Sequence, residues 1–197
     1  MHSLRITLCS FILAFVLVAC GGDTQDQQAS SSASSAPSGP IPGKVQDVGP
    51  EPVPEDLTLE TMNGESIDLS EQKGHLLLIN FWATWCAPCR EEIPDLKSLH
   101  AGLRDQGLRV IGVALDRKGR EVVAPFAKKL EINYPIVIDK EGTAESAFGP
   151  IPGLPTTIIV TPEGQITKRV VGIFPTDEMK PTLQKMLDAE ASTTGTA

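Results

Sequence analysis

Two cysteines, Cys86 and Cys89, stand three positions apart in the segment TWCAPCRE, residues 84–91. Two thiols at this spacing can bind a metal, close a short structural disulfide, or exchange disulfides with another protein. A zinc site needs four ligands, and beyond the first twenty residues the chain adds only His75 and His100. A disulfide that closes so short a loop stabilises a fold very little. The pattern therefore favours a reactive dithiol.

The expected secondary structure places this pair where a strand is followed by a helix. Residues 75–82 form a nearly continuous apolar run, as a strand buried on both faces does. Residues 88–105 repeat apolar side chains at helical spacing. The N-terminus of a helix stabilises a thiolate, so Cys86 is expected to be the attacking thiol. Cys89, one turn further along, is expected to be less exposed and to resolve the mixed disulfide.

The remaining elements complete one α/β domain. A hairpin is predicted over residues 57–69, with a type I′ turn at Asn63-Gly64. The last two predicted strands are joined by a short turn and must be antiparallel, whereas the others alternate with helices. The predicted architecture is a mixed sheet with helices on both faces. Further strands are predicted at 108–115, 136–138, 157–160 and 165–171, and further helices at 121–130, 144–148 and 177–189.

The first twenty residues have the features of an export signal. Arg5 supplies a positive charge, and residues 6–19 form an apolar run that is shorter than the roughly 20 residues of a membrane-spanning helix. The run ends in LVAC at 17–20, which resembles a bacterial lipobox. That resemblance implies that residues 1–19 are a signal peptide and that Cys20 is lipidated. An ordinary secretory signal and an uncleaved signal anchor are the alternatives, and all three place the domain outside the cytoplasm.

The rest of the chain divides by composition into three parts. Residues 20–50 are rich in Gln, Ser, Gly and Pro and poor in large apolar side chains, which predicts a flexible linker. Residues 51–190 have the size of one domain, and residues 191–197 are expected to be a loose tail. Cys9 would leave with the signal. The formal net charge of −8 argues against nucleic acid as a partner.

Two motifs carry a resemblance to a known family. FWATWCAPC, residues 81–89, is similar to the strand-to-helix active site of the thioredoxin superfamily, and GLPTT, residues 153–157, resembles its cis-proline loop. With the expected lipid anchor, the hairpin and the extra helix and strand near 120–138, the chain is most similar to the TlpA/ResA-like branch of membrane-anchored thiol-disulfide oxidoreductases. A peroxiredoxin is disfavoured, because that family carries threonine three positions before its cysteine and this chain has Ala83.

The resemblance implies a thioredoxin-like three-layer α/β/α fold with a mixed central sheet, an N-terminal β-hairpin and a helix-strand insertion. It also implies that Cys86 attacks and Cys89 resolves. Pro155 would follow a cis peptide bond, and Leu154 would lie beside Cys86 with its backbone free to pair with an extended substrate. Trp85 would cover the Cys86 sulfur and shape access to it.

One acid-base residue is expected next to the thiols. Thioredoxin has a buried aspartate six residues before its first cysteine, where this chain has Asn80, which cannot take up a proton. In the TlpA/ResA-like branch a glutamate three residues after the second cysteine serves instead, and Glu92 occupies that position. Burial on the same helix face as Cys89 would raise the pKa of Glu92 toward the range of a working base. The alternative is that Glu91 and Glu92 only complement the helix dipole, and Glu91 is expected to be solvated.

The leading hypothesis is a thiol-disulfide oxidoreductase of the cell envelope, lipid-anchored to a bacterial membrane and facing the periplasm or extracytoplasmic space. The resemblance implies that it reduces exported thiol/disulfide proteins such as apocytochrome c. Its electrons would come from a transmembrane thiol donor of the DsbD/CcdA type. No cofactor and no metal are implied, and a monomer is expected. Two alternatives remain: an oxidase that forms disulfides, and a tethered peptide-binding or chaperone module with incidental thiols.

Overall fold

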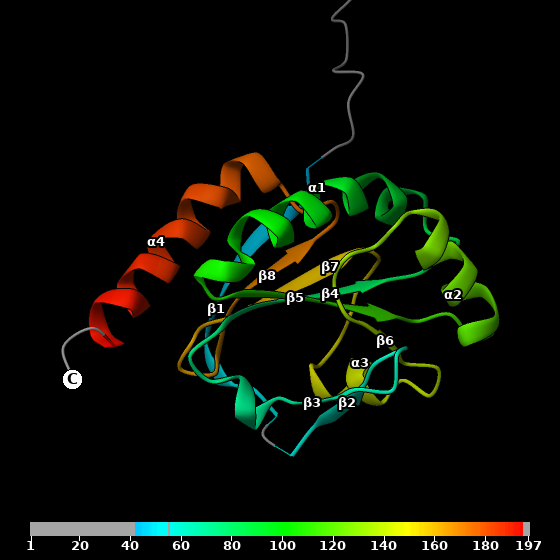
Figure 1. Ribbon diagram of the computed structural model, residues 1–197, viewed down its shortest axis with the longest axis horizontal. Coiled ribbons are helices and arrows are strands. Elements are labelled where there is room, and N and C mark those ends of the chain that lie inside the picture. The colour runs from blue at the N-terminus through cyan, green and yellow to red at the C-terminus, as the bar shows by residue number, and fades with distance from the viewer. Residues whose placement is uncertain (1–41, 55, 195–197) are drawn as a thin grey trace, which may run out of the picture. The chain divides into compact units, whose positions relative to one another are not determined.

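The computed structural model describes residues 42–54 and 56–194, and they form a six-stranded sheet in the order β1-β8-β7-β4-β5-β6 (Figure 1). Strands β4, β5 and β6 run parallel to one another. Strand β7 is antiparallel to β4, β8 is antiparallel to β7, and β1 is antiparallel to β8. The mixed sheet was predicted. The strands are β1 Lys44–Pro52, β4 Leu76–Trp82, β5 Leu108–Ala114, β6 Ile136–Ile138, β7 Thr156–Val160 and β8 Gln165–Val171.

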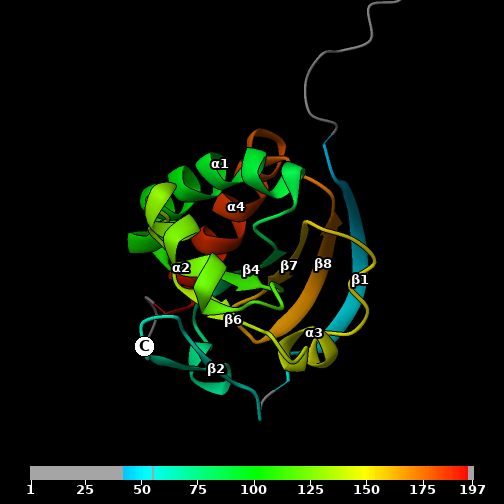
Figure 2. The ribbon, with the colours of Figure 1, turned by 90° about the vertical axis from the view of Figure 1, so that its right-hand side faces the viewer.

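Helices lie on both faces of the sheet. Figures 1 and 2 show α1, α2 and α4 over one face, and the short α3 together with a two-stranded hairpin over the other. The predicted three-layer arrangement is therefore confirmed, with one outer layer much thinner than the other. The helices are α1 Ala87–Leu103, α2 Arg120–Lys129, α3 Thr143–Ala147 and α4 Thr176–Thr194, and the hairpin pairs β2 Thr58–Glu60 with β3 Ser66–Asp68.

Strand β4 is the centre of the core, and all seven of its residues are buried. Successive side chains of a strand point to opposite faces. Leu76 and Leu78 pack with side chains of α1 and α4, while Leu77 and Ile79 pack with the hairpin and α3. Each such burial contributes about 1.5–3 kcal/mol relative to an exposed side chain. The same alternation places Asn80 on the face that α1 covers.

The parallel pairing of β4 with β5 brings two loops to one edge of the sheet. Trp82 pairs with Ala114 at the ends of these strands, so the loops that follow them start side by side. Open α/β sheets bind ligands at such carboxyl ends of strands. The first loop leads directly into Cys86.

Strand β1 was not predicted, and it corrects the expected extent of the linker. Residues 44–50 were assigned to the flexible segment, but they pair with β8 from Lys44↔Val171 onward. The register shifts between Asp47 and Glu51, and an edge strand tolerates prolines because only one side of it needs hydrogen bonds. The tail also differs from expectation, since α4 continues to Thr194.

The hairpin was predicted correctly, but its turn was not. A type I′ turn needs positive φ at both central residues. Gly64 has φ 84°, whereas in the described ranges Glu131 is the only non-glycine residue with positive φ. The loop is instead closed by hydrogen bonds from Gly64 N to Thr61 O and from Thr61 N to Glu65 O. A loop of this length needs the left-handed conformation at the glycine alone.

The predicted signal peptide, with Cys9, the lipobox and Cys20, lies outside the described residues, as does the linker up to residue 41. Within residues 42–54 and 56–194, none of the helices is both long enough and apolar enough to cross a membrane.

Candidate active site

The two cysteines occupy the start of α1, as predicted. Cys86 is the N-cap residue, and its Sγ accepts a hydrogen bond from Cys89 N at 3.2 Å. The two sulfurs are joined in a disulfide. Pro88 fits this first turn because backbone N–H groups there have no acceptor within the helix, so proline, which lacks the N–H, loses no hydrogen bond. Cys86 retains 4% exposure whereas Cys89 has none, so Cys86 is the sulfur that a partner could reach.

The predicted cis-proline loop lies against the cysteines. The Leu154-Pro155 peptide bond is cis, which confirms the expectation for Pro155. Gly172 N donates to Pro155 O at 2.8 Å, which ties the loop to the residue that follows β8. Leu154 is partly buried and packs against the apolar cluster that contains Cys86 and Cys89. The structure therefore brings the two sequence motifs together.

Glu92 is enclosed between three elements. It is 1% exposed and lies one turn after Cys89 on α1. Its Oε1 accepts a hydrogen bond from Asn80 Nδ2 at 2.7 Å, and its Oε2 accepts one from Phe174 N at 2.9 Å. Asn80 Nδ2 also donates to Thr157 Oγ1 on β7 at 3.0 Å. Both carboxyl oxygens therefore have fixed donors.

Burial raises the pKa of Glu92 from 4.5 to about 7. The hydrogen bonds from Phe174 and Asn80 favour the carboxylate and lower the pKa, but they do not outweigh desolvation. The negative charge of Asp95 adds a smaller increase. A carboxyl group with this pKa exists in both protonation states near neutral pH. The expected burial and pKa shift are confirmed.

Two other side chains with polar groups, His100 on α1 and Tyr134, are buried and contact each other. The His100 ring meets the Tyr134 ring edge-on with centroids 6.2 Å apart. Burial raises the pKa of the Tyr134 hydroxyl, and the charge of Glu92 adds to the effect. Burial also lowers the pKa of His100, which favours a neutral ring. Trp82 is fully buried against Phe126.

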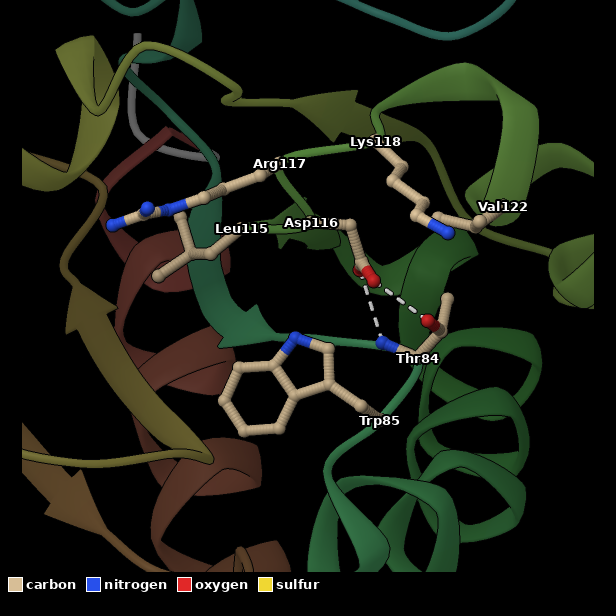
Figure 3. Close-up of a pocket in the computed structure, with 7 residues that line it drawn as sticks. All are labelled: Thr84, Trp85, Leu115, Asp116, Arg117, Lys118 and Val122. Carbon is tan, nitrogen blue, oxygen red and sulfur yellow. Dashed lines mark hydrogen bonds between the residues drawn. The ribbon is translucent and has the colours of Figure 1, made fainter.

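A buried carboxylate joins the two loops at the end of β4 and β5. Asp116 is 3% exposed and accepts hydrogen bonds from Thr84 N at 2.9 Å and from Thr84 Oγ1 at 2.6 Å. Figure 3 shows the Asp116 side chain directed at Thr84. Since Thr84 is two residues before Cys86, the interaction holds the loop that leads to Cys86.

A pocket of about 410 Å³ adjoins this pair of loops. Trp85 contributes one side and is 68% exposed, the only large apolar side chain so exposed in the described part of the chain. Arg117 and Lys118 contribute another side, and Figure 3 shows them extending in opposite directions from their loop. The role of Trp85 in covering the sulfur of Cys86 stays a prediction.

Sequence reasoning found the thiols, the proline loop and Glu92 but missed their support. Asn80 was noted only as unable to take up a proton, whereas it donates to Glu92. Asp116 and the two cations after it were not singled out. A charged triplet directly after a buried parallel strand is a signal that could have identified them.

In the described ranges, no group of three or more histidine, cysteine or acidic side chains is arranged to hold a metal ion. The groups that the structure gathers at the site are the two sulfurs, the buried carboxyl group of Glu92 and the Leu154-Pro155 loop.

Comparisons with known proteins agree with this geometry. Residues 51–169 match the AhpC/TSA family. The chain is 35% identical over 116 residues to the thiol-disulfide oxidoreductase ResA of Bacillus subtilis, covering 59% of this chain and 64% of that protein. It is also 35% identical over 135 residues to ResA of Halalkalibacterium halodurans, covering 68% of this chain and 75% of that protein.

Solved structures give the same result. A thiol:disulfide interchange protein of the thioredoxin family from Chlorobium tepidum is 27% identical, with a TM-score of 0.64, covering 72% of this chain and 99% of that one. StoA from Bacillus subtilis is also 27% identical, with a TM-score of 0.58, covering 66% of this chain and 98% of that one.

Proposed function

The chain belongs to the AhpC/TSA family and is a thioredoxin-like thiol-disulfide oxidoreductase, and from this premise we propose that it works as a reductant of exported proteins. The observation that supports the proposal is the arrangement of three groups around one helix N-terminus. Cys86 keeps 4% exposure, Cys89 is fully buried one turn further along, and Glu92 follows after another turn with a pKa of about 7.

The reaction is a two-step exchange that balances without a cofactor. The Cys86 thiolate attacks one sulfur of a substrate disulfide, forming a mixed disulfide and releasing the other substrate sulfur as a thiolate, which takes up a proton. Cys89 then loses its proton to Glu92 and attacks the Cys86 sulfur. The second substrate thiolate leaves, and the Cys86–Cys89 disulfide remains. The substrate gains the two electrons that the dithiol loses.

Substrate binding is assigned to the Leu154-Pro155 loop and to Trp85. Leu154 packs against the cluster that holds both cysteines, so an extended substrate segment pairing with its backbone would lie across Cys86. Such pairing is tolerant of side chains, which suits an enzyme with several substrates. Trp85 would bound this segment on the side away from the proline loop.

A peroxide-reducing role is not favoured for this member of the family. Ala83 has no hydroxyl group where peroxiredoxins carry threonine. The second cysteine lies within one helical turn of the first and is already joined to it in a disulfide, as dithiol exchange requires. ResA is named a thiol-disulfide oxidoreductase, and the Chlorobium tepidum protein is named a thiol:disulfide interchange protein.

The proposed setting is the cell envelope. Cleavage after residue 19 and lipidation of Cys20 would anchor the protein to a bacterial membrane, with the domain facing the periplasm or extracytoplasmic space. Its substrates would be exported proteins, with apocytochrome c as the leading example because its haem-attachment cysteines must be reduced. Because such compartments are oxidising, the dithiol would be restored by a transmembrane thiol donor of the DsbD/CcdA type.

The reduction potential of the Cys86–Cys89 couple tests the direction of exchange. The full chain, solubilised in detergent, is equilibrated in defined thiol buffers, and tryptophan emission reports the redox state. A value near that of thioredoxin, about −270 mV, supports a reductant, whereas a value near that of DsbA, about −120 mV, overturns the proposal in favour of an oxidase.

A double variant separates the enzyme from a binding module. Cys86→Ser/Cys89→Ser keeps the groove beside Leu154 but has no dithiol. If it restores a deletion strain as well as the parent protein does, the thiols are incidental and the reductase assignment is wrong.

A further inference from the structure

The pocket beside Trp85 is not needed for the exchange steps described above, yet two of its lining residues, Thr84 and Trp85, directly precede Cys86 in the chain. Its wall from the β4 loop consists of Thr84 and Trp85, and Trp85 is the residue directly before Cys86. Its other wall comes from the loop after β5 and the start of α2. A substrate segment that crosses Cys86 therefore has its neighbouring side chains within reach of this pocket.

The pocket combines an apolar surface with positive charge. The exposed indole of Trp85 is accompanied by the side chains of Leu115 and Val122. Arg117 and Lys118 are exposed, and in the described part of the chain neither belongs to an ion pair. Two adjacent cations therefore lie on one loop beside the exposed indole, in a chain whose formal net charge is −8.

The one acidic residue in the pocket does not neutralise both cations. Asp116 is buried, and its two oxygens accept hydrogen bonds from Thr84. Figure 3 shows its side chain turned to Thr84 and lying between the directions taken by Arg117 and Lys118. One carboxylate against two cations leaves a net positive charge on this loop. Its hydrogen bonds also hold the loop next to the segment that carries Cys86.

We propose that Trp85, Arg117 and Lys118 form a specificity subsite that receives an acidic side chain of the substrate polypeptide close to the cysteine being exchanged. The inference rests on the proposed function, because it concerns the substrate of the same site. The net positive charge of the loop attracts the carboxylate, and the aliphatic stem of the acidic side chain packs on the indole. Complementary charge of this kind mainly increases the rate of encounter and selects among partners.

Matched peptides test the subsite. Each peptide has one cysteine, joined in a disulfide to the neutral 2-thiopyridyl group, and carries Glu, Gln or Lys two residues before and two residues after that cysteine. The pre-reduced full chain attacks the peptide sulfur, and pyridine-2-thione is released and followed by its absorbance. We expect the second-order rate constant to decrease in the order Glu, Gln, Lys, by about threefold per step at low ionic strength, with the difference shrinking as salt is added.

Two double variants assign the effect to the pocket. Arg117→Gln/Lys118→Gln should remove the preference, so that the rate constants for the Glu, Gln and Lys peptides become equal. Lys128→Gln/Lys129→Gln removes the same amount of charge from exposed residues at the opposite end of α2, and it should keep the preference. Equal loss in both double variants would mean that only the overall charge matters, and would overturn the subsite.

A binding measurement gives a readout that does not depend on turnover. Peptides with serine in place of the cysteine are titrated against the oxidised protein, and the emission of the exposed Trp85 is followed; buried Trp82 contributes a constant background. The Glu peptide should bind more tightly than the Gln peptide in the parent protein and equally in Arg117→Gln/Lys118→Gln.

The outcomes separate this inference from the one it rests on. If the reduced protein releases pyridine-2-thione from none of the peptides, the proposed reductase function fails and the subsite fails with it. If all peptides react and bind alike, the reductase function stands and the subsite alone is wrong.

Discussion

Asn80 donates its side-chain N–H to Glu92 Oε1 across 2.7 Å, from the centre of β4 to the first half of α1. Asn80 stands where thioredoxin has its buried aspartate, and in this chain the residue at that position holds a carboxyl group instead of supplying one. Phe174 N fixes the other oxygen of Glu92. The geometry of this carboxyl group is set before any substrate arrives.

Replacing Glu92 should slow exchange and change its pH profile. A positioned general base contributes about 10²–10⁴-fold to a rate, so Glu92→Gln is expected to lower the rate of disulfide reduction by at least about tenfold. It should also abolish the ionisation near pH 7 that the buried carboxyl group contributes. The matched control is Glu91→Gln, because Glu91 is exposed. A pH profile unchanged in Glu92→Gln would remove Glu92 from the mechanism.

The same carboxyl group should make stability depend on pH. Below pH 4.5 Glu92 is protonated in both the folded and the unfolded chain, so it does not lower the unfolding free energy. Between pH 4.5 and about 7 the unfolded chain releases the proton while the folded protein retains it, so the unfolding free energy falls as pH rises. The total loss is about 3 kcal/mol, since one pKa unit corresponds to about 1.4 kcal/mol.

Urea unfolding of the oxidised protein between pH 4 and pH 8 measures this loss. Glu92→Gln should lack that part of the pH slope, whereas Glu91→Gln should keep it. The difference between parent and variant is the relevant quantity, because other groups contribute equally to both. Parallel curves for the parent and Glu92→Gln would show that Glu92 titrates alike in the folded and unfolded chain.

An aspartate at position 80, as in thioredoxin, should change the pH dependence of exchange and lower the stability of this protein. Asn80→Asp removes the donor to Glu92 and places a second carboxyl group beside it. Two carboxyl groups at such a distance cannot both ionise readily, so the apparent pKa of the pair rises above that of Glu92 alone. We expect the pH midpoint of exchange to move upward and the unfolding free energy at pH 7 to fall by about 1–3 kcal/mol. An unshifted midpoint would contradict the assigned contact.

The exposure of the two sulfurs predicts different fates for single variants. Cys89→Ser leaves Cys86 able to attack but removes the resolving thiol, so covalent complexes with substrates should accumulate. Cys86→Ser leaves only the fully buried Cys89, and no complex should form. Non-reducing electrophoresis after mixing with an oxidised peptide distinguishes the two. Equal trapping by both variants would mean that the order of attack is not fixed.

Asp116 should stabilise the loop before Cys86. Asp116→Ala leaves Thr84 N and Thr84 Oγ1 without their acceptor. Because Thr84 is only partly buried, the loss of stability should be near the lower end of the roughly 1–3 kcal/mol that a buried unpaired donor costs. Urea unfolding of Asp116→Ala, Thr84→Val and the double variant at fixed pH measures the coupling between the two side chains. Strictly additive effects would show that the Oγ1 contact contributes nothing to stability.

The parts of the fold that were predictable are those set by local patterns. The continuous apolar run of β4 reflects burial on both faces, and the CxxC segment marks the helix start because N-capping is a local preference. Strand β1 was missed because its residues include Gly49, Pro50 and several charges, and it is a strand only through pairing with β8. Long-range pairing leaves little trace in composition.

The candidate site divides in the same way. Cys86, Cys89 and Glu92 lie at the start of one helix, so their proximity could be predicted from their spacing in the sequence. The residues that hydrogen-bond to Glu92 and to the loop before Cys86 come from other elements. The hydrogen bonds of Asn80 and Phe174 to Glu92 depend on how β4 and the segment before α4 pack against α1. The interaction of Thr84 with Asp116 depends on which strand pairs with β4. Such partners require the three-dimensional arrangement.

The edge position of β1 has a practical consequence for any shortened form of the protein. A fragment that begins at residue 51, where composition places the start of the domain, lacks Lys44–Pro50 and leaves the backbone groups of β8 open along one side. An uncovered edge strand pairs readily with the same strand of another molecule. Such a fragment should self-associate, and a protease that cut at the end of β1, close to residue 50, would create a similar one from the longer chain. Residues whose composition resembles a linker therefore cover the edge of β8 and oppose its pairing with another copy of the chain.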